Sequence, residues 1–312
     1  MALLARKTTL LVKAESSYAT DASPSNSANA VLVRDVSLEP LQSDEVERTL
    51  VRGYLGNYET LLANSRAQLS ATIELAGSGA AGTANQGISA LLKSCGMSET
   101  VASGTSVTYA PVSASFSSCT IYVNLDGVNH ALTGCRGTFS ISASVGEIPT
   151  ISFEMTGKYN NPADVTQPAC TYQNQATPQI FKNGNTSSFQ LMGYAGALES
   201  WSFDMNNEIV HRVVVGGTEE VLITDRKPSG SCTIESVLLA SHNFFTDATG
   251  SSTGTNTWAH GSAGNKVTVS CPQSDIGAPS YGDSDGIRTL EIPFVATPTG
   301  SGGNNELSIV FA

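Results

Sequence analysis

Charged residues are scarce in this 312-residue chain, and their scarcity is the first constraint on its function. They make up 14% of the sequence, whereas soluble domains average about 25%. Gly, Ser, Thr, Asn and Ala take their place, which is more typical of β-sandwich and assembly proteins than of metabolic enzymes. The net charge is −11, from 16 Lys and Arg against 27 Asp and Glu. Proteins that bind DNA tightly neutralise its phosphates with Lys and Arg, so this excess of acidic residues argues against a tight DNA-binding function.

Long apolar runs are also missing. No stretch approaches the roughly 18 apolar residues of a membrane-spanning helix, and the short apolar start meets Arg6 and Lys7 without a signal peptide. The six Cys form no Cys-x-x-Cys pair. We therefore expect no membrane partner, synthesis in a cytoplasm, and free, mostly buried thiols. A disulfide between Cys119 and Cys135, facing each other across a hairpin, remains the alternative after release into an oxidising medium.

Motifs for catalysis and cofactor binding are weak. Gly77–Gly82 satisfies G-x-G-x-x-G, but a dinucleotide-binding fold needs repeated strand–helix–strand units. Only Asn85–Cys95 has the apolar spacing of a clear helix. Asp283–Gly286 resembles part of a calcium loop without its closing Glu, so a β-turn is the simpler interpretation. The four His show no zinc-ligand spacing. We predict no catalytic residue, no metal and no cofactor.

The chain does contain a repeat. Ser70–Glu74 (SATIE) recurs as Ser231–Glu235 (SCTIE), and a long polar, β-rich stretch follows each copy. Similar segments close the two stretches, Thr150–Phe153 in the first half and Thr289–Ile292 in the second. A repeat near half the chain length predicts two tandem copies of one domain.

The predicted fold is mainly β, with two tandem β-sandwich domains that each carry at most one short helix. We place the first domain at 1–165, a proline-containing linker at 166–177 and the second domain at 178–312. Period-two alternation of apolar and polar residues indicates the strands. The expected strands are 8–13, 29–41, 70–75, 120–125, 138–145, 148–156, 188–192, 198–205, 266–270, 288–296 and 306–311, with another starting at 231.

Two long polar segments, 42–69 and 206–230, precede the two copies of the repeat and are interpreted as arms. Loops of this length in compact domains are usually functional or disordered. The alternative is a pair of solvated loops, but these would leave apolar side chains in water. Tyr and Arg are enriched in protein interfaces. The candidate interface residues are Arg48, Arg52, Tyr54, Leu55, Tyr58 and Arg66 in the first arm, and Glu208, His211, Arg212, Val214, Glu219 and Glu220 in the second.

A series of further segments, taken in their order, resembles the tail tube (major tail) proteins of long-tailed bacteriophages. The likeness covers most of the chain, although each motif is loose. The segments are Arg6–Leu10, Ala14–Ala22, Ala30–Leu38, Arg52–Gly56, Gly146–Pro149, Phe153–Tyr159, Thr257–Asn265, Leu290–Ala296 and Asn305–Phe311.

The resemblance implies an architecture and a set of partners. In that family, six sandwich domains form a ring, their inner sheets join into one β-barrel around a DNA-wide lumen, and hairpin arms stack the rings. A two-domain chain would need three copies, so we expect trimeric, pseudo-sixfold rings stacked through both arms. The implied partners are further copies of the chain, other tail proteins at the tube ends, and passing double-stranded DNA without tight binding. The implied location is the virion tail, assembled in the host bacterial cytoplasm.

Two other functions are compatible with the composition. A receptor-binding β-sandwich module, from a phage or another surface structure, predicts exposed aromatic clusters at loop ends and a small oligomer. An enzyme that uses the Gly-rich loop predicts a bound nucleotide. We favour the structural tail tube subunit, mainly because of the family resemblance.

Overall fold

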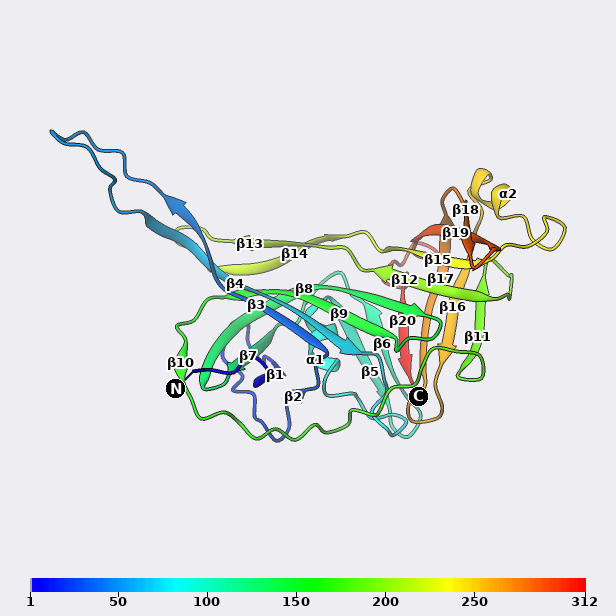
Figure 1. Cartoon of the computed structure of the whole chain (residues 1–312), viewed down its shortest axis with the longest axis horizontal. Coiled ribbons are helices and arrows are strands. Elements are labelled where there is room, and N and C mark those ends of the chain that lie inside the picture. Colours follow the sequence, from blue (N-terminus) through cyan, green and yellow to red (C-terminus); the bar gives the residue numbers. More distant parts are fainter. Residues whose placement is uncertain (1) are drawn as a thin grey trace.

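Antiparallel strands dominate the chain, in agreement with the alternating sequence pattern. The computed structural model describes residues 2–312 as an elongated molecule that is mainly β, with two short helices (Figure 1). The first half contains β1 (Thr8–Ala14), β2 (Ala30–Val31), β3 (Asp35–Val46), β4 (Leu61–Glu74), α1 (Ser89–Ser94), β5 (Met97–Ala102), β6 (Ser106–Pro111), β7 (Cys119–Leu125), β8 (Val128–Ser144), β9 (Thr150–Lys158) and β10 (Ala163–Asp164). The second half contains β11 (Thr186–Leu191), β12 (Leu198–Asp204), β13 (Asn207–Arg212), β14 (Glu220–Arg226), β15 (Ser229–Glu235), α2 (Phe244–Thr249), β16 (Thr253–His260), β17 (Val267–Ile276), β18 (Ser280–Ser284), β19 (Ile287–Ala296) and β20 (Ser308–Phe311).

The repeated pentapeptides occupy equivalent places in the two halves. The first copy ends β4 and pairs with β9, where Ile73 lies opposite Ile151. The second copy ends β15 and pairs with β19, where Ile234 lies opposite Leu290. All four side chains are buried. The strands matched by sequence are therefore also partners in space, in the same register.

The two halves share a complete strand order. In the first half the hydrogen-bonded neighbours run β1-β7-β8-β9-β4-β3, with β10 added beside β8. In the second half they run β11-β16-β17-β19-β15-β12, with β20 added beside β17. Each half has one short helix, which follows the repeated pentapeptide. The β5–β6 hairpin occurs in the first half only. Beside β19, β17 pairs with its last residues and β18 pairs with its first residues.

One junction joins the halves into a single sheet. β8 is long, is bulged between Thr133 and Arg136, and passes from β7 on one sheet to β9 on the other. On its free edge the last part of β8 pairs with β12, so that Ser142 lies opposite Ser202 and Ile141 opposite Phe203. The joined sheet has the order β3-β4-β9-β8-β12-β15-β19-β18, four strands from each half. We call it the joined sheet below.

The core continues through this junction. In the second half Trp201 stacks on Phe203 at 5.8 Å and meets Trp258 edge-on at 5.6 Å. Phe203 also lies 6.4 Å from Phe139 of the first half. These aromatic rings are buried. Because apolar burial is the main favourable term in folding, the junction belongs to the hydrophobic core rather than to a hinge.

Further contacts hold the halves together, and two of them lie outside the second arm. β20, at the end of the chain, pairs with β6, and the Gly-rich loop meets the loop before β17. In that second contact the Gly77 N–H donates to Asn265 Oδ1 at 2.6 Å, and the Gly79 N–H donates to Gly264 O at 2.9 Å. A Cβ on Gly77 would lie 2.6 Å from Gly264 O. Glycine is required at position 77 because a side chain there would prevent this close contact between the two backbones. The glycines of the G-x-G-x-x-G pattern are thus explained by packing, without a bound nucleotide.

Several local predictions are confirmed and others need correction. The Asp126-Gly127 and Asp285-Gly286 turns both have the paired positive φ angles of tight hairpins. The predicted helix 85–95 is shorter, because the part before Ser89 forms turns tied together by Asn85. The predicted strand 29–41 is broken into β2 and β3. The β5–β6 hairpin, β16 and α2 were not predicted, although buried positions alternate along β6.

Candidate assembly interfaces

The first arm extends away from the body of the molecule. β3 and β4 pair as far as Val46 and Leu61, and the chain between them forms the projecting tip (Figure 1). Val51 and Leu55 at this tip are fully exposed, at 104% and 101%. Such apolar side chains have no partner among residues 2–312, which is the pattern of a surface that another molecule covers.

Aromatic and charged side chains organise the tip of the first arm. The Arg52 guanidinium lies 4.4 Å from the Tyr54 ring centre and 4.2 Å from that of Tyr58, and it donates to Asn57 O at 3.1 Å. Cation–π contacts at exposed sites contribute about 0.5–1 kcal/mol each. A second Arg, at position 48, pairs with Glu59 across the loop. These contacts hold the loop in a defined conformation that exposes Val51 and Leu55 to solvent.

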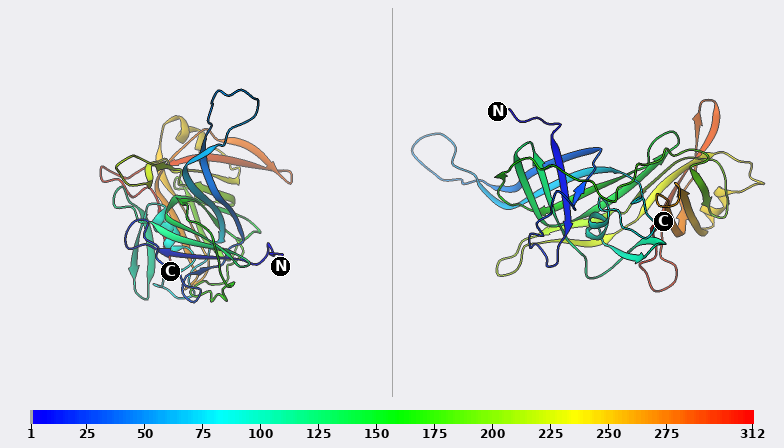
Figure 2. Two further views of the ribbon diagram at one scale, coloured as in Figure 1. Left: turned by 90° about the vertical axis from the view of Figure 1, so that its left-hand side faces the viewer. Right: turned by 90° about the horizontal axis from the view of Figure 1, so that it is seen from below.

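The second arm lies against the first half of the same chain. It is formed by the β13–β14 hairpin and points toward the same end of the molecule as the first arm (Figures 1 and 2). Val221 in β14 is fully buried. Its N–H donates to the Tyr18 hydroxyl at 2.5 Å, and its carbonyl accepts from Arg136 Nη1 at 2.8 Å. Burial raises the pKa of Tyr18, against opposing effects of its bond with Val221 and of Arg136, so the phenol stays neutral at pH 7.

Charged residues of the second arm are used partly within the chain. Glu219 accepts from His211 Nε2 at 2.9 Å if that nitrogen carries the proton, and its other oxygen lies 3.5 Å from Lys158 Nζ. Lys158 belongs to the first half, so this group also fastens the arm. The remaining candidates lie at the surface, with Glu220 half-buried and Glu208, Arg212 and Val214 exposed.

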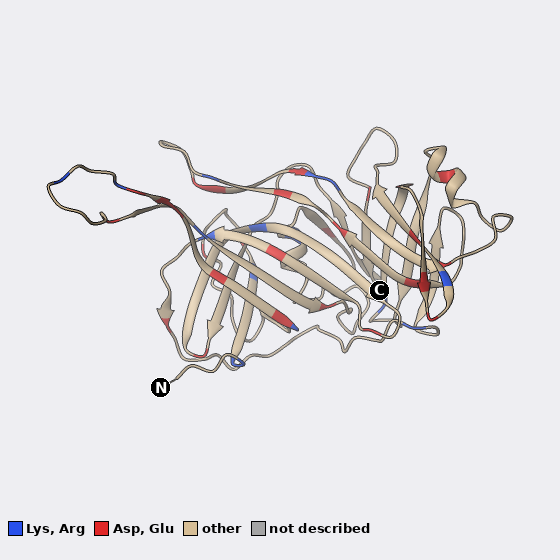
Figure 3. Cartoon of the chain, turned by 45° about the horizontal axis from the view of Figure 1, so that its top comes forward, with Lys and Arg blue, Asp and Glu red and all other residues tan. Residues whose placement is uncertain are grey.

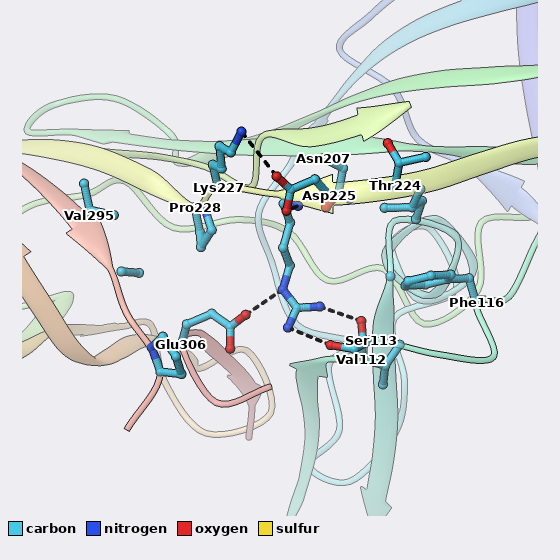
Figure 4. Close-up of a pocket in the computed structure, with 15 residues that line it drawn as sticks. Val112, Ser113, Phe116, Asn207, Thr224, Asp225, Lys227, Pro228, Val295 and Glu306 are labelled. Atoms are coloured by element: carbon cyan, nitrogen blue, oxygen red, sulfur yellow. Dashed lines mark hydrogen bonds and ion pairs between the residues drawn. The ribbon is translucent and has the colours of Figure 1, made fainter. Parts of the chain in front are cut away.

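The base of the second arm is held by a largely buried arginine, Arg226, which contacts Glu306 and Val112; both of these partners are labelled in Figure 4. Arg226 Nε donates to Glu306 Oε1 at 2.5 Å, and Nη1 donates to Val112 O at the same distance. Nη2 also reaches Asn304 Oδ1 at 2.7 Å. The Arg226 and Glu306 side chains are 16% and 7% exposed. The guanidinium thus connects the arm to both halves of the chain.

The equivalent arginine in the first arm has no such lock. Arg66 lies opposite Gln42 in β3–β4, as Arg226 lies opposite Asn207 in β13–β14. Its guanidinium is 3.9 Å from the exposed carboxylate of Asp44. The arginine at this hairpin position is thus 16% exposed and bonded to several groups in the second arm, whereas in the first arm it is 29% exposed and has one distant ion pair.

One face of the joined sheet is polar, and its central strand segments lack cations, whereas Arg66, Arg136 and Lys158 lie on the same face at the end near the arms. On each strand the residues alternate between the core and this open face. The strand segments 35–39, 68–74, 138–144, 150–156, 200–204, 229–235, 280–284 and 289–295 contain no Lys or Arg. Ser and Thr dominate the open face, and acidic residues are spread over it (Figure 3). The strand pairings place seven acidic residues on the same side of the sheet as Ser70 and Thr72. They are Asp35, Glu39, Glu74, Glu154, Asp204, Glu235 and Glu291.

The structure gathers the predicted interface residues into two regions. Arg48, Arg52, Tyr54, Leu55 and Tyr58 form the tip of the first arm, and Arg66 lies at its base. The second-arm residues lie on one hairpin, part of which contacts the first half. Sequence reasoning missed the partners of that hairpin, which are Tyr18, Arg136, Lys158 and Glu306.

Other kinds of site find little support in the described residues. Within residues 2–312 no group of three His, Cys, Asp or Glu side chains is arranged to hold a metal ion. In the same range no helix has the length and apolar character needed to cross a bilayer. Cys119 and Cys135 lie opposite each other in β7 and β8 as free, buried thiols, as expected, and the alternative of their pairing after oxidation is untested.

Comparison with known proteins identifies the family. The family described as phage tail tube protein matches residues 5–296, which is nearly the whole chain. A search of curated proteins found no match. The mainly β fold agrees with the family, whose members are structural proteins of the virion tail. The chain therefore belongs to the phage tail tube protein family.

Proposed function

We propose that three copies of this chain close into a ring of six repeated units, and that such rings stack into the tail tube through which DNA leaves the virion. The β8–β12 junction is the observation that carries the proposal. There the edge of one unit pairs with the edge of the next inside a single chain. Each unit therefore already uses a head-to-tail contact, which forms a closed ring when the rotation per step returns to its start.

The free edges of the joined sheet support further growth of the same kind. Among residues 2–312, β3 pairs only with β4 and β18 only with β19. Unpaired strand edges attract other strands, and natural proteins cover, interrupt or pair them. A ring pairs every edge. The separate boundaries proposed above, 1–165 and 178–312, fit this scheme as the two units of each chain.

The open face of the joined sheet suits a DNA conduit. Its acidic and hydroxyl side chains would line the lumen when the sheet closes with its core outward. Its central segments contain no Lys or Arg, and basic residues on this face are confined to Arg66, Arg136 and Lys158 near the arms. Few phosphates could therefore be neutralised, so DNA would pass without adhering. The alternative, a receptor-binding module, predicts exposed aromatic residues at loop ends, and Tyr54, exposed beside Tyr58 at the tip of the first arm, fits that expectation as well. The paired edges of the joined sheet favour the tube, because a receptor-binding module does not need them.

The arms would stack one ring on the next. In the first arm the candidates are the exposed apolar residues and the Arg52–Tyr54–Tyr58 group; in the second arm they are the exposed residues at the hairpin tip, including Arg212 and Val214. Burying apolar surface at about 25 cal/mol per Å² would favour stacking. Other tail proteins would use the same surfaces at the tube ends, and assembly would take place in the host bacterial cytoplasm.

Electron microscopy of two matched variants tests this function. One variant replaces residues 47–60 by Asn-Gly, which closes the Val46–Leu61 pair with a two-residue hairpin turn. The second variant replaces 213–219 by Asn-Gly between Arg212 and Glu220. We expect tubes from the parent protein, separate rings from the first variant and shortened or fewer tubes from the second. Full-length tubes from both variants would refute stacking by the arms, and compact particles from the parent would refute the tube.

A further inference from the structure

The joined sheet contains a template for contact with a second copy of the chain. The edge β12 is the repeat equivalent of the free edge β3, because Ser202 pairs with Ser231 as Ser37 pairs with Ser70. The edge formed by the end of β8 is likewise the equivalent of free β18. In the first half Ser142 of β8 lies opposite Thr150 of β9, and in the second half Gly282 of β18 lies opposite Thr289 of β19. Because Thr150 and Thr289 occupy equivalent positions in the repeat, Gly282 is the equivalent of Ser142.

We infer that β3 of one copy pairs antiparallel with β18 of the next copy, in the register of the internal β12–β8 pair. This inference rests on the ring proposed above and specifies its interface. Carrying the register across gives five residue pairs, the first residue of each pair in one copy and the second in its neighbour. They are Asp35 with Ser284, Val36 with Asp283, Ser37 with Gly282, Leu38 with Tyr281, and Glu39 with Ser280.

Side-chain burial agrees with this assignment. In the internal junction Phe203 lies opposite Ile141, and both are about 1% exposed. Their free-edge equivalents are Leu38, which is half-buried, and Tyr281, which is 54% exposed. Tyr281 lies on the core side of its sheet, with its ring 5.6 Å from that of Phe245. The two apolar side chains are thus uncovered where their equivalents are buried against each other.

Both edges are also suitable for pairing in chemical terms. Within residues 2–312 no other strand covers the outer side of β3 between 35 and 39 or that of β18. The paired residues are uncharged or acidic: Asp35 and Glu39 would each lie opposite a Ser hydroxyl, and Asp283 would lie opposite Val36. No pair in the inferred register sets two like charges directly opposite, an arrangement that destabilises a sheet. The acids of β3 would continue the polar open face.

Disulfide cross-linking tests the register directly. In the internal junction the Met205–Phe139 pair is hydrogen-bonded through the backbone. Hydrogen-bonded and non-hydrogen-bonded pairs alternate along an antiparallel ladder, so Asp204 opposite Ser140 is a non-hydrogen-bonded pair. In such non-hydrogen-bonded pairs the Cα atoms are about 4.5 Å apart, close enough for a disulfide. The equivalent intermolecular test is Glu39→Cys with Ser280→Cys in a Cys170→Ser background. The other native thiols are buried.

Two control pairs complete the experiment. Asp204→Cys with Ser140→Cys should give a disulfide within one chain, which shows that the pair geometry supports oxidation. Glu39→Cys with Ser284→Cys shifts one partner by four residues, about 13 Å along a strand, and should give no covalent oligomer. The test pair should give covalent dimers and trimers on non-reducing gels, without larger closed species.

The outcomes separate this inference from the proposed ring. Rings in the microscope without cross-links in the test pair, when the internal control is oxidised, would overturn the β3–β18 interface and leave the ring intact. A stronger product from the shifted pair would overturn the register. Cross-linked open chains without rings would support the interface and refute ring closure. Neither rings nor cross-links would refute both.

Discussion

The two arms are equivalent hairpins in very different surroundings. The second arm lies along the first half of its own chain, where Val221 is buried and Arg226 reaches Glu306. The first arm has Leu55 and Val51 fully exposed at its tip. The repeat gives both hairpins the same connection, after an edge strand and before the pentapeptide strand. Their environments differ because the preceding unit is present in the chain for the second arm only.

The difference indicates how a duplicated chain divides its interfaces. Contacts of the second unit with the first are intramolecular and can be built from buried, specific pairs. The corresponding contacts of the first unit would need another copy, so its side chains remain exposed until assembly. Under the proposed function, the base of the first arm and β3 would meet the second unit of a neighbouring copy, as the second arm meets the first unit here.

The largest expected effect is on stability at the internal junction. Phe203→Ala should lower the free energy of unfolding by about 3–5 kcal/mol, because a buried aromatic side chain leaves a cavity. Its free-edge equivalent, Leu38→Ala, should lower it by only about 1 kcal/mol, since that side chain is half-buried in the single chain. Urea unfolding of disassembled protein measures both. Equal losses would show that the two edges are not in different environments.

The next effect concerns the two arginines at the arm bases. Arg226→Ala should cost about 3 kcal/mol, because it leaves the nearly buried Glu306 carboxylate without its partner. Arg66→Ala should change stability by less than about 1 kcal/mol, because its ion pair with Asp44 is solvent-exposed. The same unfolding assay applies, with Arg226→Lys as a partial restoration. A large loss for Arg66→Ala alone would reverse the comparison of the arms.

The smallest effect concerns the pH dependence of stability, to which both units contribute, because burial lowers the pKa of His130 in β8 as well as that of His260. His260, the last residue of β16, contacts Thr186 Oγ1 and Gln179 O, whereas the equivalent strand β7 ends at Leu125. Burial lowers the pKa of His260 below its ordinary 6.5, partly opposed by the bond to Gln179. The unfolded chain therefore takes up the proton first, and stability falls as the pH drops from 6.5 to the lowered pKa.

A His260→Gln variant provides the control for this pH dependence. Its free energy of unfolding should change less than that of the parent between pH 7 and pH 5. Hydrogen exchange should locate the part of the acid-sensitive loss that His260→Gln removes in the second unit, around β11 and β16. An unchanged pH profile in the variant would show that another group controls acid sensitivity.

Local features of the fold were accessible from the sequence. The pentapeptide repeat predicted a duplicated architecture, and the structure gives both copies the same partner strand and register. The Asp-Gly turns were predicted because only residues that tolerate positive φ suit such hairpins. Strand alternation found most of the joined sheet, whose core-facing residues recur every second position.

Long-range relations were not accessible. The Arg226–Glu306 pair joins residues 80 positions apart, and no local pattern distinguishes this arginine from Arg66. The β8–β12 junction depends on which edge each strand leaves free, which alternation alone does not determine. The sequence also described both arms as polar segments, because burial of Val221 arises from Tyr18 and Arg136 in another part of the chain. Tertiary contacts decide these features.

A cryo-electron-microscopy map of the assembled protein would test the central claim most directly, through the strand that lies next to β3. We predict three chains in each ring and, at every boundary between chains, β3 hydrogen-bonded to β18 of the adjacent copy with Glu39 opposite Ser280. A map in which β3 faces solvent, or pairs with any other strand, would contradict the account.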